Sequence, residues 1–310
     1  MDQKKLVEQF KQRDKRALSR LLSGLAENDA NAEEALEKLA ADSGQAHVVG
    51  ITGPPGVGKS TLVGCVASTL HVHGQTVGII CVDPSSKVSG GALLGDRLRL
   101  GKVANEEGIY VRSFASRGEA GGLVSSAWGA VLAMEAFGFD TVLVETVGSG
   151  QGEVDIGNLV DTLVLVTAPG LGDQVQFLKA GIMEVADIFV INMGDHAGSK
   201  DTLADLCGAL SLRGLSEWVP PVLVTTAVTG EGVPELVKAL WRHLEYLEKT
   251  GERRRRRRRR FEEHVRLIVW REIRRQIEER LQRLPDRGGE RMPFSTARTV
   301  LGSLRESGWL

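Results

Sequence analysis

The sequence predicts an α/β fold in which a mainly parallel β-sheet is covered by helices on both faces. Six short apolar runs carry this prediction, at 47–52, 76–83, 141–148, 162–168, 187–193 and 221–227. The runs are continuous rather than alternating, as in strands that are buried on both faces. Helix-length segments separate most of them, which is the order of elements in a parallel sheet. With 310 residues, 42% of them hydrophobic, the chain can bury a core of this kind.

Helical segments are predicted on either side of the sheet region. Near the N-terminus, apolar residues recur at helical spacing, and Asn31 precedes "AEEALEKLA", which has acids in its first turn. The segment 233–249 is expected to be the last helix of the body, and a long amphipathic helix is expected after the arginine run 253–260. We therefore expect an N-terminal helical extension over 1–44, a nucleotide-binding domain over 45–250 and a basic C-terminal arm over 251–310.

Charge is distributed unevenly along the chain. The net charge is −1, but residues 251–310 hold 18 Lys and Arg against 9 Asp and Glu, which leaves −10 for the first 250 residues. This asymmetry indicates a tail that contacts another molecule, such as a second copy of the body. No aromatic residues interleave the arginines, so a solvated or dimer-contacting arm is favoured over a nucleic-acid site, with an acidic partner surface as a third alternative.

The cysteines and the N-terminus indicate a cytoplasmic protein. Cys65, Cys81 and Cys207 have no metal-binding or redox spacing, and the first two lie in apolar runs, where a small buried hydrophobe is expected. The N-terminus has no apolar signal-peptide core, and no run approaches the ~18 apolar residues of a membrane span. We expect neither a membrane nor a disulfide framework.

A phosphate-binding loop is the strongest motif. "GPPGVGKST" has Gly53, Gly58, Lys59 and Ser60 in the G-x-x-x-x-G-K-[ST] pattern, after the first strand and before a helix. Its backbone N–H groups are expected to wrap phosphate oxygens, because side chains at the glycines would obstruct a close approach. Lys59 is expected to reach the β- and γ-phosphates and the Ser60 hydroxyl to bind Mg²⁺.

Acidic residues near strand ends supply the other half of such a site. Glu145 ends the run "VLVE", and Gly148 follows it at the spacing of a γ-phosphate contact. Asp83 and Asp96 are further acids within reach, although each alone is as often a solvated turn residue. A buried structural carboxylate is the less favoured alternative for Glu145. Together with the loop, these acids are interpreted as groups that hold the metal and orient the attacking water.

Two positions modify the expected activity. Ser149 follows Gly148 where Ras-like GTPases have a water-positioning glutamine, which predicts slow intrinsic hydrolysis, with Gln151 or a partner completing the site. The segment "FVINMGDHAG" (189–198) has the outline of the guanine-reading Asn-Lys-x-Asp loop, with Met193 in place of the lysine and Gly194 after it. Taken alone it would be interpreted as a plain turn.

The motifs together resemble one family. "GPPGVGKS", "DPSSKVSGGALLGDRLRL", "VRSFASRG", "VETVGSGQGEVD", "PGLGDQVQFLKAGIMEVADIFVIN" and "TTAVTGEGVPEL" are similar, in this order, to the MeaB/ArgK GTPases. The resemblance spans residues ~45–250 and implies a P-loop NTPase fold. It implies a G-protein chaperone of an adenosylcobalamin-dependent acyl-CoA mutase, such as methylmalonyl-CoA mutase, that gates cofactor loading, protection and release. It also implies homodimerisation through the C-terminal arm, Mg²⁺ with GTP or GDP, and no cobalamin site of its own.

The resemblance also implies roles for individual residues. Metal and water would be arranged by Ser60, Asp83, Asp96 and Glu145, with Lys59 on phosphate. Asp173, Gln176 and Lys179 in "GDQVQFLK" would form an additional switch that relays nucleotide state, although Gln176 and Lys179 by themselves are typical of a solvated helix face. Nucleotide contacts are implied for Gly53, Gly56, Val57, Gly58, Lys59, Ser60, Thr61, Gly148, Asn192, Asp195 and Ala227.

Two residues depart from the family pattern. Gly152 replaces the serine of the usual GQSE, which is expected to loosen that switch, and Met193 replaces the guanine-loop lysine. Asp195 retains the carboxylate that accepts hydrogen bonds from guanine. We therefore predict that guanine specificity is kept and that nucleotide affinity is weakened.

Three other functions compete with the chaperone interpretation. A P-loop kinase acting on a transport protein is the main alternative. A metal-insertion GTPase is less favoured, because His71 and His73 stand at i and i+2 of a helix and point to different sides. A nucleic-acid-binding NTPase is also less favoured, since no specific nucleic-acid motif accompanies the arginines.

Overall fold

The computed structural model describes residues 3–42, 44–83, 100, 103, 105–115, 125–146, 152–170, 182–211, 217–284 and 292–309. For residues 42, 83, 115, 125–126 and 152–155 it describes the backbone alone. The chain divides into two compact units, Met1–Arg260 and Phe261–Leu310.

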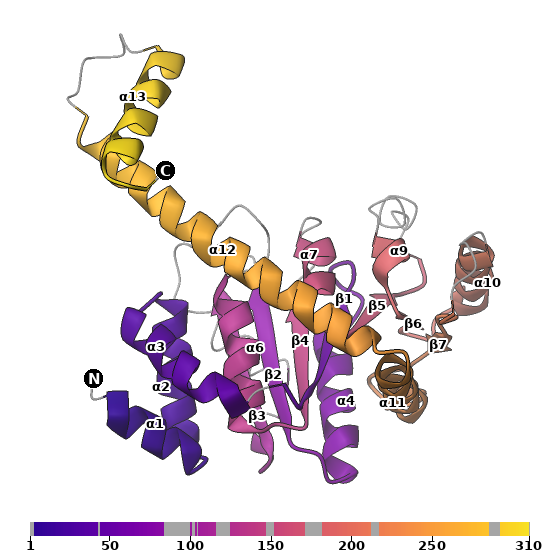
Figure 1. Cartoon of the computed structure of the whole chain (residues 1–310). Coiled ribbons are helices and arrows are strands. Elements are labelled where there is room, and N and C mark those ends of the chain that lie inside the picture. Colours follow the sequence, from indigo (N-terminus) through magenta and orange to yellow (C-terminus); the bar gives the residue numbers. More distant parts are fainter. Residues whose placement is uncertain are drawn as a thin grey trace. The chain divides into compact units, whose positions relative to one another are not determined.

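A seven-stranded parallel sheet forms the centre of the first unit, in the order β3-β2-β4-β1-β5-β6-β7 (Figure 1). The strands are β1 (His47–Thr52), β2 (Val77–Asp83), β3 (Ile109–Ala115), β4 (Thr141–Thr146), β5 (Thr162–Thr167), β6 (Ile188–Ile191) and β7 (Val222–Val224). All strand pairs are parallel. The α/β class and the six predicted strands are therefore confirmed.

Strand β3 is the element that the apolar runs did not predict. It pairs with β2 at one edge of the sheet, with Ile79 opposite Val111. Its sequence "IYVRSFA" mixes apolar and polar residues, and Tyr110 and Arg112 are part exposed. An edge strand lacks the double burial that gives a continuous apolar run, so a search for such runs passes over it.

Helices cover both faces of the sheet. On one face lie α4 (Lys59–Val72) and α11 (Val233–Lys249), which pack against each other. On the other face lie α6 (Ser125–Phe137) and α7 (Gly152–Leu159), as the close approach of Met134 to Gly78 and of Ile156 to Gly50 shows. The short α9 (Ile182–Val185) and α10 (Ser199–Ser211) lie near β5, β6 and β7. The predicted helix 233–249 is confirmed.

The N-terminal extension folds as three helices, α1 (Gln3–Lys11), α2 (Lys15–Ala26) and α3 (Ala30–Leu39), followed by the short 3-10 helix η1 (Ala40–Asp42). Asp14 and Asp29 cap α2 and α3 through their side chains. The cap of α3 is thus two residues before Asn31, whose own N–H donates to Asp29. These helices pack on α6, where the Phe10 and Phe137 rings meet edge to face at 5.1 Å.

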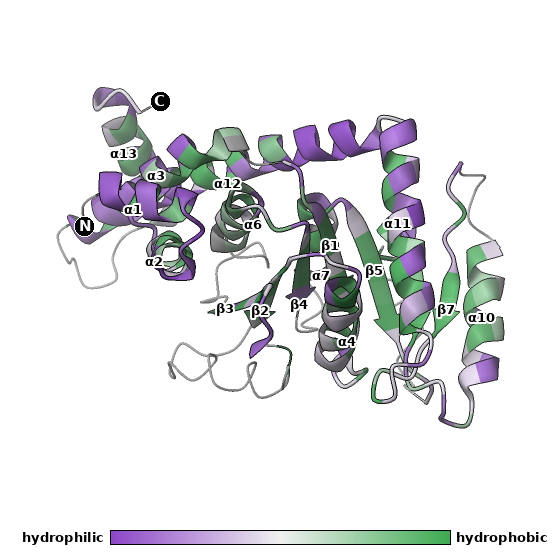
Figure 2. Cartoon of the chain, turned by 90° about the horizontal axis from the view of Figure 1, so that it is seen from below, coloured by the Kyte–Doolittle hydropathy of each residue, from purple (hydrophilic) through white to green (hydrophobic). Residues whose placement is uncertain are grey.

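The arginine run does not form a separate tail. It lies inside one 31-residue helix, α12 (Glu252–Gln282), which is separated from the end of α11 by two residues, Thr250 and Gly251. Figure 2 shows the beginning of α12 as strongly hydrophilic, in contrast to the hydrophobic strands. Residues up to Arg260 belong to the first unit. With the run included, that unit holds 29 Lys and Arg against 32 Asp and Glu, so most of its acidic excess is balanced within the unit.

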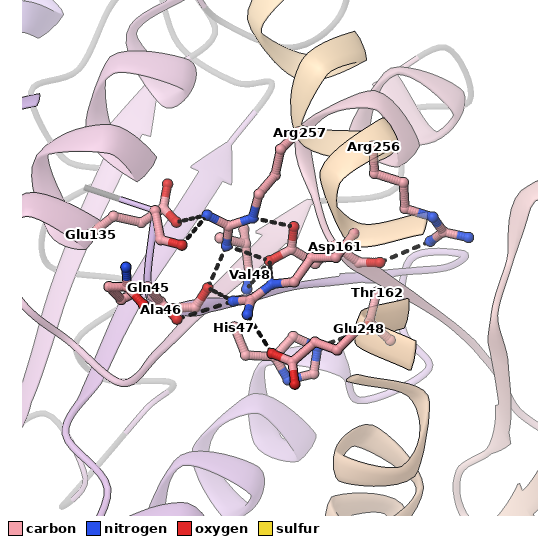
Figure 3. Close-up of polar contacts among 12 residues, drawn as sticks. Gln45, Ala46, His47, Val48, Glu135, Asp161, Thr162, Glu248, Arg256 and Arg257 are labelled. Carbon is pink, nitrogen blue, oxygen red and sulfur yellow. Dashed lines mark hydrogen bonds and ion pairs between the residues drawn. The ribbon is translucent and has the colours of Figure 1, made fainter. Parts of the chain in front are cut away.

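Four of the arginines, at i, i+3, i+4 and i+7, turn inward on acids of the body: Arg253, Arg256, Arg257 and Arg260. Arg257 lies between two buried carboxylates, with Nη2 2.9 Å from Asp161 Oδ2 and Nη1 3.1 Å from Glu135 Oε1 (Figure 3). Arg256 binds Asp187 through both terminal nitrogens, at 2.7 and 2.9 Å. We call these four residues the inner arginines. The sequence favoured a solvated or dimer-contacting role for this part of the run. In the structure the inner arginines instead contact acids of their own chain.

Asp161 and Asp187 stand immediately before β5 and β6, at the amino ends of these strands. Burial alone raises the pKa of Asp187, but hydrogen bonds from His243 and Arg256 outweigh it and bring the pKa to about 2. The pKa of Asp161 is also lowered, because Arg257 and Arg260 outweigh the effect of burial. Both acids therefore remain ionised and hold the first turns of α12 against the sheet.

The second unit is a helical hairpin. The remainder of α12 and α13 (Pro293–Glu306) form it, and Val300 and Leu304 of α13 are buried. Arg280 of α12 donates to Ser303 Oγ at 3.2 Å and to Ser307 Oγ at 2.6 Å. Val265, Ile268 and Val269 remain 39–51% exposed on α12. In the part of the chain that the structure describes, no helix is long and apolar enough to cross a bilayer.

Candidate functional site

The phosphate-loop motif connects β1 to α4, as the sequence predicts. Gly53 has φ 150°, and a side chain there would strike the backbone carbonyl of Val166 in β5. Gly58 has φ 82°, and a Cβ atom would lie 2.6 Å from the Asn192 amide nitrogen. The glycines are thus required by neighbouring strands and loops of the protein, in addition to the close approach of a phosphate.

Lys59 is the first residue of α4, and its side chain turns back into the loop. The residue is 6% exposed, and Nζ donates to the carbonyls of Gly53 at 2.7 Å and Pro54 at 2.8 Å. A buried ammonium group at a helix N-terminus concentrates positive charge where the loop turns. This is the electrostatic environment that a phosphate requires.

Ser60 and Glu145 are brought together by the fold. Ser60 Oγ donates to Glu145 Oε1 at 2.6 Å, although 85 residues separate them in sequence. Glu145 lies near the carboxyl end of β4, is 3% exposed and stands opposite Cys81 of β2 in register. The Cys81 thiol approaches the second oxygen, Glu145 Oε2, at 3.9 Å. Sequence reasoning assigned Glu145 to the site, but it assigned Cys81 to the core.

The remaining acids of the predicted metal site are described only in part. Asp83 is the last residue of β2, one position beyond the pairing of Val82 with Thr146, so its backbone lies at the same sheet edge. Asp96 and Gly148 lie outside the described residues. Among the side chains that are placed, no three His, Cys, Asp or Glu residues gather as a metal site.

A hydroxyl and a carboxylate 2.6 Å apart beside a phosphate loop are hard oxygen donors, the kind that Mg²⁺ prefers. Mg²⁺ is usually bound by few protein ligands together with substrate phosphates and waters, so the described pair fits this ion. Ser60 and Glu145 are the described side chains that would hold it.

The loop after β6 is joined to the phosphate loop through Asn192. Its Nδ2 donates to the Val57 carbonyl at 2.8 Å, and its Oδ1 accepts from the Ala227 N–H and the Thr225 hydroxyl, each at 3.0 Å. Asn192 is 2% exposed. Asn192 therefore links three loops by hydrogen bonds: the phosphate loop, the loop after β6 and the loop after β7. Thr225, which sequence reasoning did not single out, completes this link.

Met193 is part-buried and Asp195 is exposed in the turn that follows Asn192. Met193 has φ 58°, an uncommon conformation for a residue with a side chain, and its terminal methyl group, Cε, lies near Gly58. Met193 packs partly against the apolar core of the body. Asp195, two residues later, is exposed. The turn thus presents a carboxylate to solvent at the carboxyl edge of the sheet, while its methionine contacts the phosphate loop.

Three further predicted residues, Asp173, Gln176 and Lys179, lie outside the described residues, so their switch role stays a prediction. Gly152 is the first residue of α7, and Gly56 and Thr61 are exposed beside the loop. Ala227 is 3% exposed and contributes its N–H to Asn192.

A cavity of about 590 Å³ lies elsewhere, near the amino ends of β5 and β6. Trp218, Tyr246 and Arg256 are among its lining residues, and none of the phosphate-loop residues is. In parallel α/β sheets ligands bind at the carboxyl ends of the strands, so we assign the nucleotide to the loop and not to this cavity.

Comparison with known proteins gives a consistent result. Residues 15–282 match the family model described as methylmalonyl Co-A mutase-associated GTPase MeaB. A Pyrococcus horikoshii protein named as a GTPase is 42% identical over 285 residues, covering 91% of this chain and 90% of that protein. GTPase ArgK of Escherichia coli is 39% identical over 199 residues, covering 62% of this chain and 60% of ArgK.

The mouse protein "Methylmalonic aciduria type A homolog, mitochondrial" is 37% identical over 209 residues, covering 66% of this chain and 50% of that protein. A crystal structure of a LAO/AO transport system kinase superposes with a TM-score of 0.71 at 25% identity, covering 98% of this chain and 97% of that one. Strand order, phosphate loop and sequence similarity along most of the chain agree. The chain belongs to the MeaB family and is a P-loop GTPase.

Proposed function

We propose that this GTPase is a G-protein chaperone of an adenosylcobalamin-dependent acyl-CoA mutase. The observation that carries the proposal is the match to the mutase-associated family across 15–282, which includes the whole of α12 as well as the nucleotide domain. The relationship to the mouse methylmalonic aciduria type A homolog supports the same client class. In this role nucleotide state would gate the loading, protection and release of the mutase cofactor.

The proposed reaction is attack of water on the γ-phosphorus of GTP, in line with the bond to the β-phosphate oxygen, which breaks to leave GDP and phosphate. Lys59 would neutralise charge on the β- and γ-phosphates. Ser60 and Glu145, with Asp83 and Asp96, would hold Mg²⁺, which offsets phosphate charge when bound. Asp96 and Glu145 would also orient the water, and Gly148 would contact the γ-phosphate.

Base recognition is proposed for Asp195, whose carboxylate accepts hydrogen bonds from the guanine N1–H and 2-amino groups. Asn192 would act mainly as the brace that keeps this loop in register with the phosphate loop, because three of its hydrogen bonds go to protein groups. Asp173, Gln176 and Lys179 would relay nucleotide state to the mutase.

Dimerisation through the C-terminal arm is part of the proposal. The exposed apolar residues of α12, Val265, Ile268 and Val269, support it, because a group of apolar side chains exposed on one helix is typical of an interaction surface. The arm that dimerises would be the second unit, since the inner arginines are engaged within the first.

The decisive experiment measures GTP turnover with and without purified candidate mutases, together with co-purification of each pair. A client should bind the chain and change its GTP turnover, whereas binding and rates that no mutase affects would overturn the chaperone proposal.

A kinase acting on a transport protein is the alternative, because a structure of that name superposes along nearly the whole chain. With GTP labelled on the γ-phosphate, the chaperone proposal expects the label as free phosphate. Label transferred to a protein would favour the kinase.

A further inference from the structure

Two of the three cysteines lie against the proposed nucleotide site, at opposite ends of it. Cys81 of β2 approaches the Glu145 carboxylate at 3.9 Å, on the side where Mg²⁺ is proposed. Cys65 of α4 donates its thiol hydrogen to the Ala227 carbonyl at 3.0 Å. This contact is on the side of the loop after β6, residues 192–195, which we call the base-reading loop. The third cysteine, Cys207 of α10, is exposed.

The Cys81 contact bears on how Glu145 is held. Glu145 is 3% exposed, and a carboxylate buried to this extent requires hydrogen-bond donors. Ser60 donates to one oxygen, Oε1, and the Cys81 thiol faces the other, Oε2. Because Cys81 and Glu145 are paired residues of adjacent parallel strands, their separation is fixed by the sheet itself. The thiol thus helps to set the plane of the carboxylate, and through it the direction of the Ser60 hydroxyl.

The Cys65 contact bears on the base-reading side. Ala227 receives a hydrogen bond at its carbonyl from Cys65 and donates one from its N–H to Asn192 Oδ1. Burial raises the pKa of the Cys65 thiol, so the thiol keeps its proton and remains a donor at neutral pH. Cys65 therefore links α4, which follows the phosphate loop, to the loop that Asn192 braces.

We propose that Cys81 and Cys65 are positioning residues of the GTPase site, with separable tasks. Cys81 orients the Glu145–Ser60 pair and serves the metal side. Cys65 fixes Ala227 and the base-reading loop and serves base selectivity. This assignment rests on the nucleotide site proposed above, and it differs from the expectation that both residues are only small buried hydrophobes.

The test uses the full-length chain with five variants, Cys81→Ala, Cys81→Ser, Cys65→Ala, Cys65→Ser and Cys207→Ala. Each is assayed for GTP turnover, for GDP affinity with Mg²⁺ and with a chelator, and for ADP affinity. Thermal unfolding of each variant separates loss of the contact from loss of the fold. Thiols are weak donors, so effects of about threefold to tenfold are expected.

Cys81→Ala should lower kcat and reduce the gain in GDP affinity that Mg²⁺ gives, while GDP affinity with chelator is unchanged. Cys81→Ser should recover part of this loss, since a hydroxyl also donates. Cys65→Ala should weaken GDP binding with and without Mg²⁺ and leave ADP binding unchanged, so the GDP-to-ADP selectivity falls. Cys65→Ser should restore it, and Cys207→Ala should match the wild type.

If a cysteine variant loses turnover, GDP affinity and ADP affinity equally, in proportion to its loss of thermal stability, the thiols are only packing residues. Unchanged values in all assays would also overturn the proposal. Lys59→Ala and Asp195→Ala distinguish this failure from a wrong site. If these two variants abolish or degrade GDP binding while the cysteine variants do not, the site stands and the thiol roles fall. If they leave GDP binding unchanged, the nucleotide site itself is wrong.

Discussion

Met193 stands where the base-reading loops of related GTPases carry lysine, and its surroundings explain how the loop tolerates the exchange. Its methyl end lies near Gly58 and its side chain packs partly on the core, so the aliphatic part of the lysine role is preserved. A methionine has no ammonium group to donate to neighbouring loops. Apolar contact is kept and a charge-assisted hydrogen bond is lost.

Met193→Lys should therefore tighten GDP binding about fivefold, the effect of one additional hydrogen bond from a charged group at a part-exposed site. His196→Lys, in the exposed part of the same turn, adds the same charge without contact to the phosphate loop and is the matched control. Titration of GDP by calorimetry measures both. Equal affinities of Met193→Lys and wild type would mean that the ammonium group has no function in this loop.

Gly56 and Gly58 permit a comparison within the phosphate loop. Both have positive φ, 83° and 82°, but a Cβ atom at Gly56 would meet open space, whereas one at Gly58 would lie 2.6 Å from Asn192 Nδ2. Each alanine substitution carries a backbone penalty of about 1–2 kcal/mol.

We expect Gly58→Ala to lower the free energy of unfolding by about 1–3 kcal/mol more than Gly56→Ala, because it also displaces the buried Asn192 amide from its acceptor. Urea unfolding of both variants without nucleotide measures the difference. Equal losses would contradict the claim that Asn192 and Gly58 are tightly packed against each other.

At the scale of secondary-structure elements, the first two turns of α12 bind the amino edge of the sheet through hydrogen bonds and ion pairs. Arg253 donates to the carbonyls of Gln45 and Ala46, Arg257 to those of Gly44 and Ala46, and Arg260 pairs with Glu135 of α6 at 2.8 Å. Burial raises the pKa of Glu135 more than Arg260 and Arg257 lower it. Strands β1, β5 and β6, whose amino ends are held here, lead into the phosphate loop, the segment after Gly170 and the base-reading loop.

Arg257→Ala should lower the free energy of unfolding by about 3–5 kcal/mol, because it leaves the Asp161 and Glu135 carboxylates buried with fewer partners. Arg254→Ala, the same change on the exposed side of the same helix, should change it by less than about 0.5 kcal/mol. Chemical unfolding of the two variants gives the comparison. Similar small effects would show that the inner arginines are solvated in solution.

At the scale of the whole molecule, a chain of buried polar side chains runs from β1 through β5 and α11 to the residue before β6. This chain makes the stability of the protein depend on pH. His47 Nε2 lies 2.7 Å from Thr162 Oγ1, which lies 2.8 Å from His243 Nδ1, and His243 Nε2 lies 3.3 Å from Asp187 Oδ1. Burial lowers the pKa of His47 to about 3, from an ordinary value of 6.5. In the folded chain His47 is therefore neutral, whereas in the unfolded chain it takes up a proton below pH 6.5.

Because the unfolded state binds more protons between pH 6.5 and 3, stability should fall as the pH is lowered through this window, by several kcal/mol in all. Asp187 adds a second loss at lower pH, between its ordinary value of 3.8 and its folded value of about 2. His47→Gln should flatten the upper window, and His196→Gln, an exposed histidine, should not. Urea unfolding at pH 7, 6, 5 and 4 measures the slope, and an unchanged slope in His47→Gln would assign the acid sensitivity to other groups.

Much of the molecule follows from local sequence pattern. Continuous apolar runs identify six of the seven strands, because strands buried on both faces need apolar residues at every position. The order of a glycine-rich loop, a lysine and a helix places the phosphate loop, since its chemistry is contained in nine consecutive residues. Strand β3, with polar residues on an exposed edge, gives no such pattern.

The sequence by itself determined the fold class, the phosphate loop and the family, because each depends on residues that are near one another in the chain. Only the tertiary structure decided what the arginine run and the cysteines contact. Helical spacing can predict that the four inner arginines share one face of α12. It cannot predict that the carboxylates of Asp161, Asp187 and Glu135 lie opposite that face. The same holds for Cys65 and Cys81, whose partners are 162 and 64 residues away and are set by strand register and helix packing.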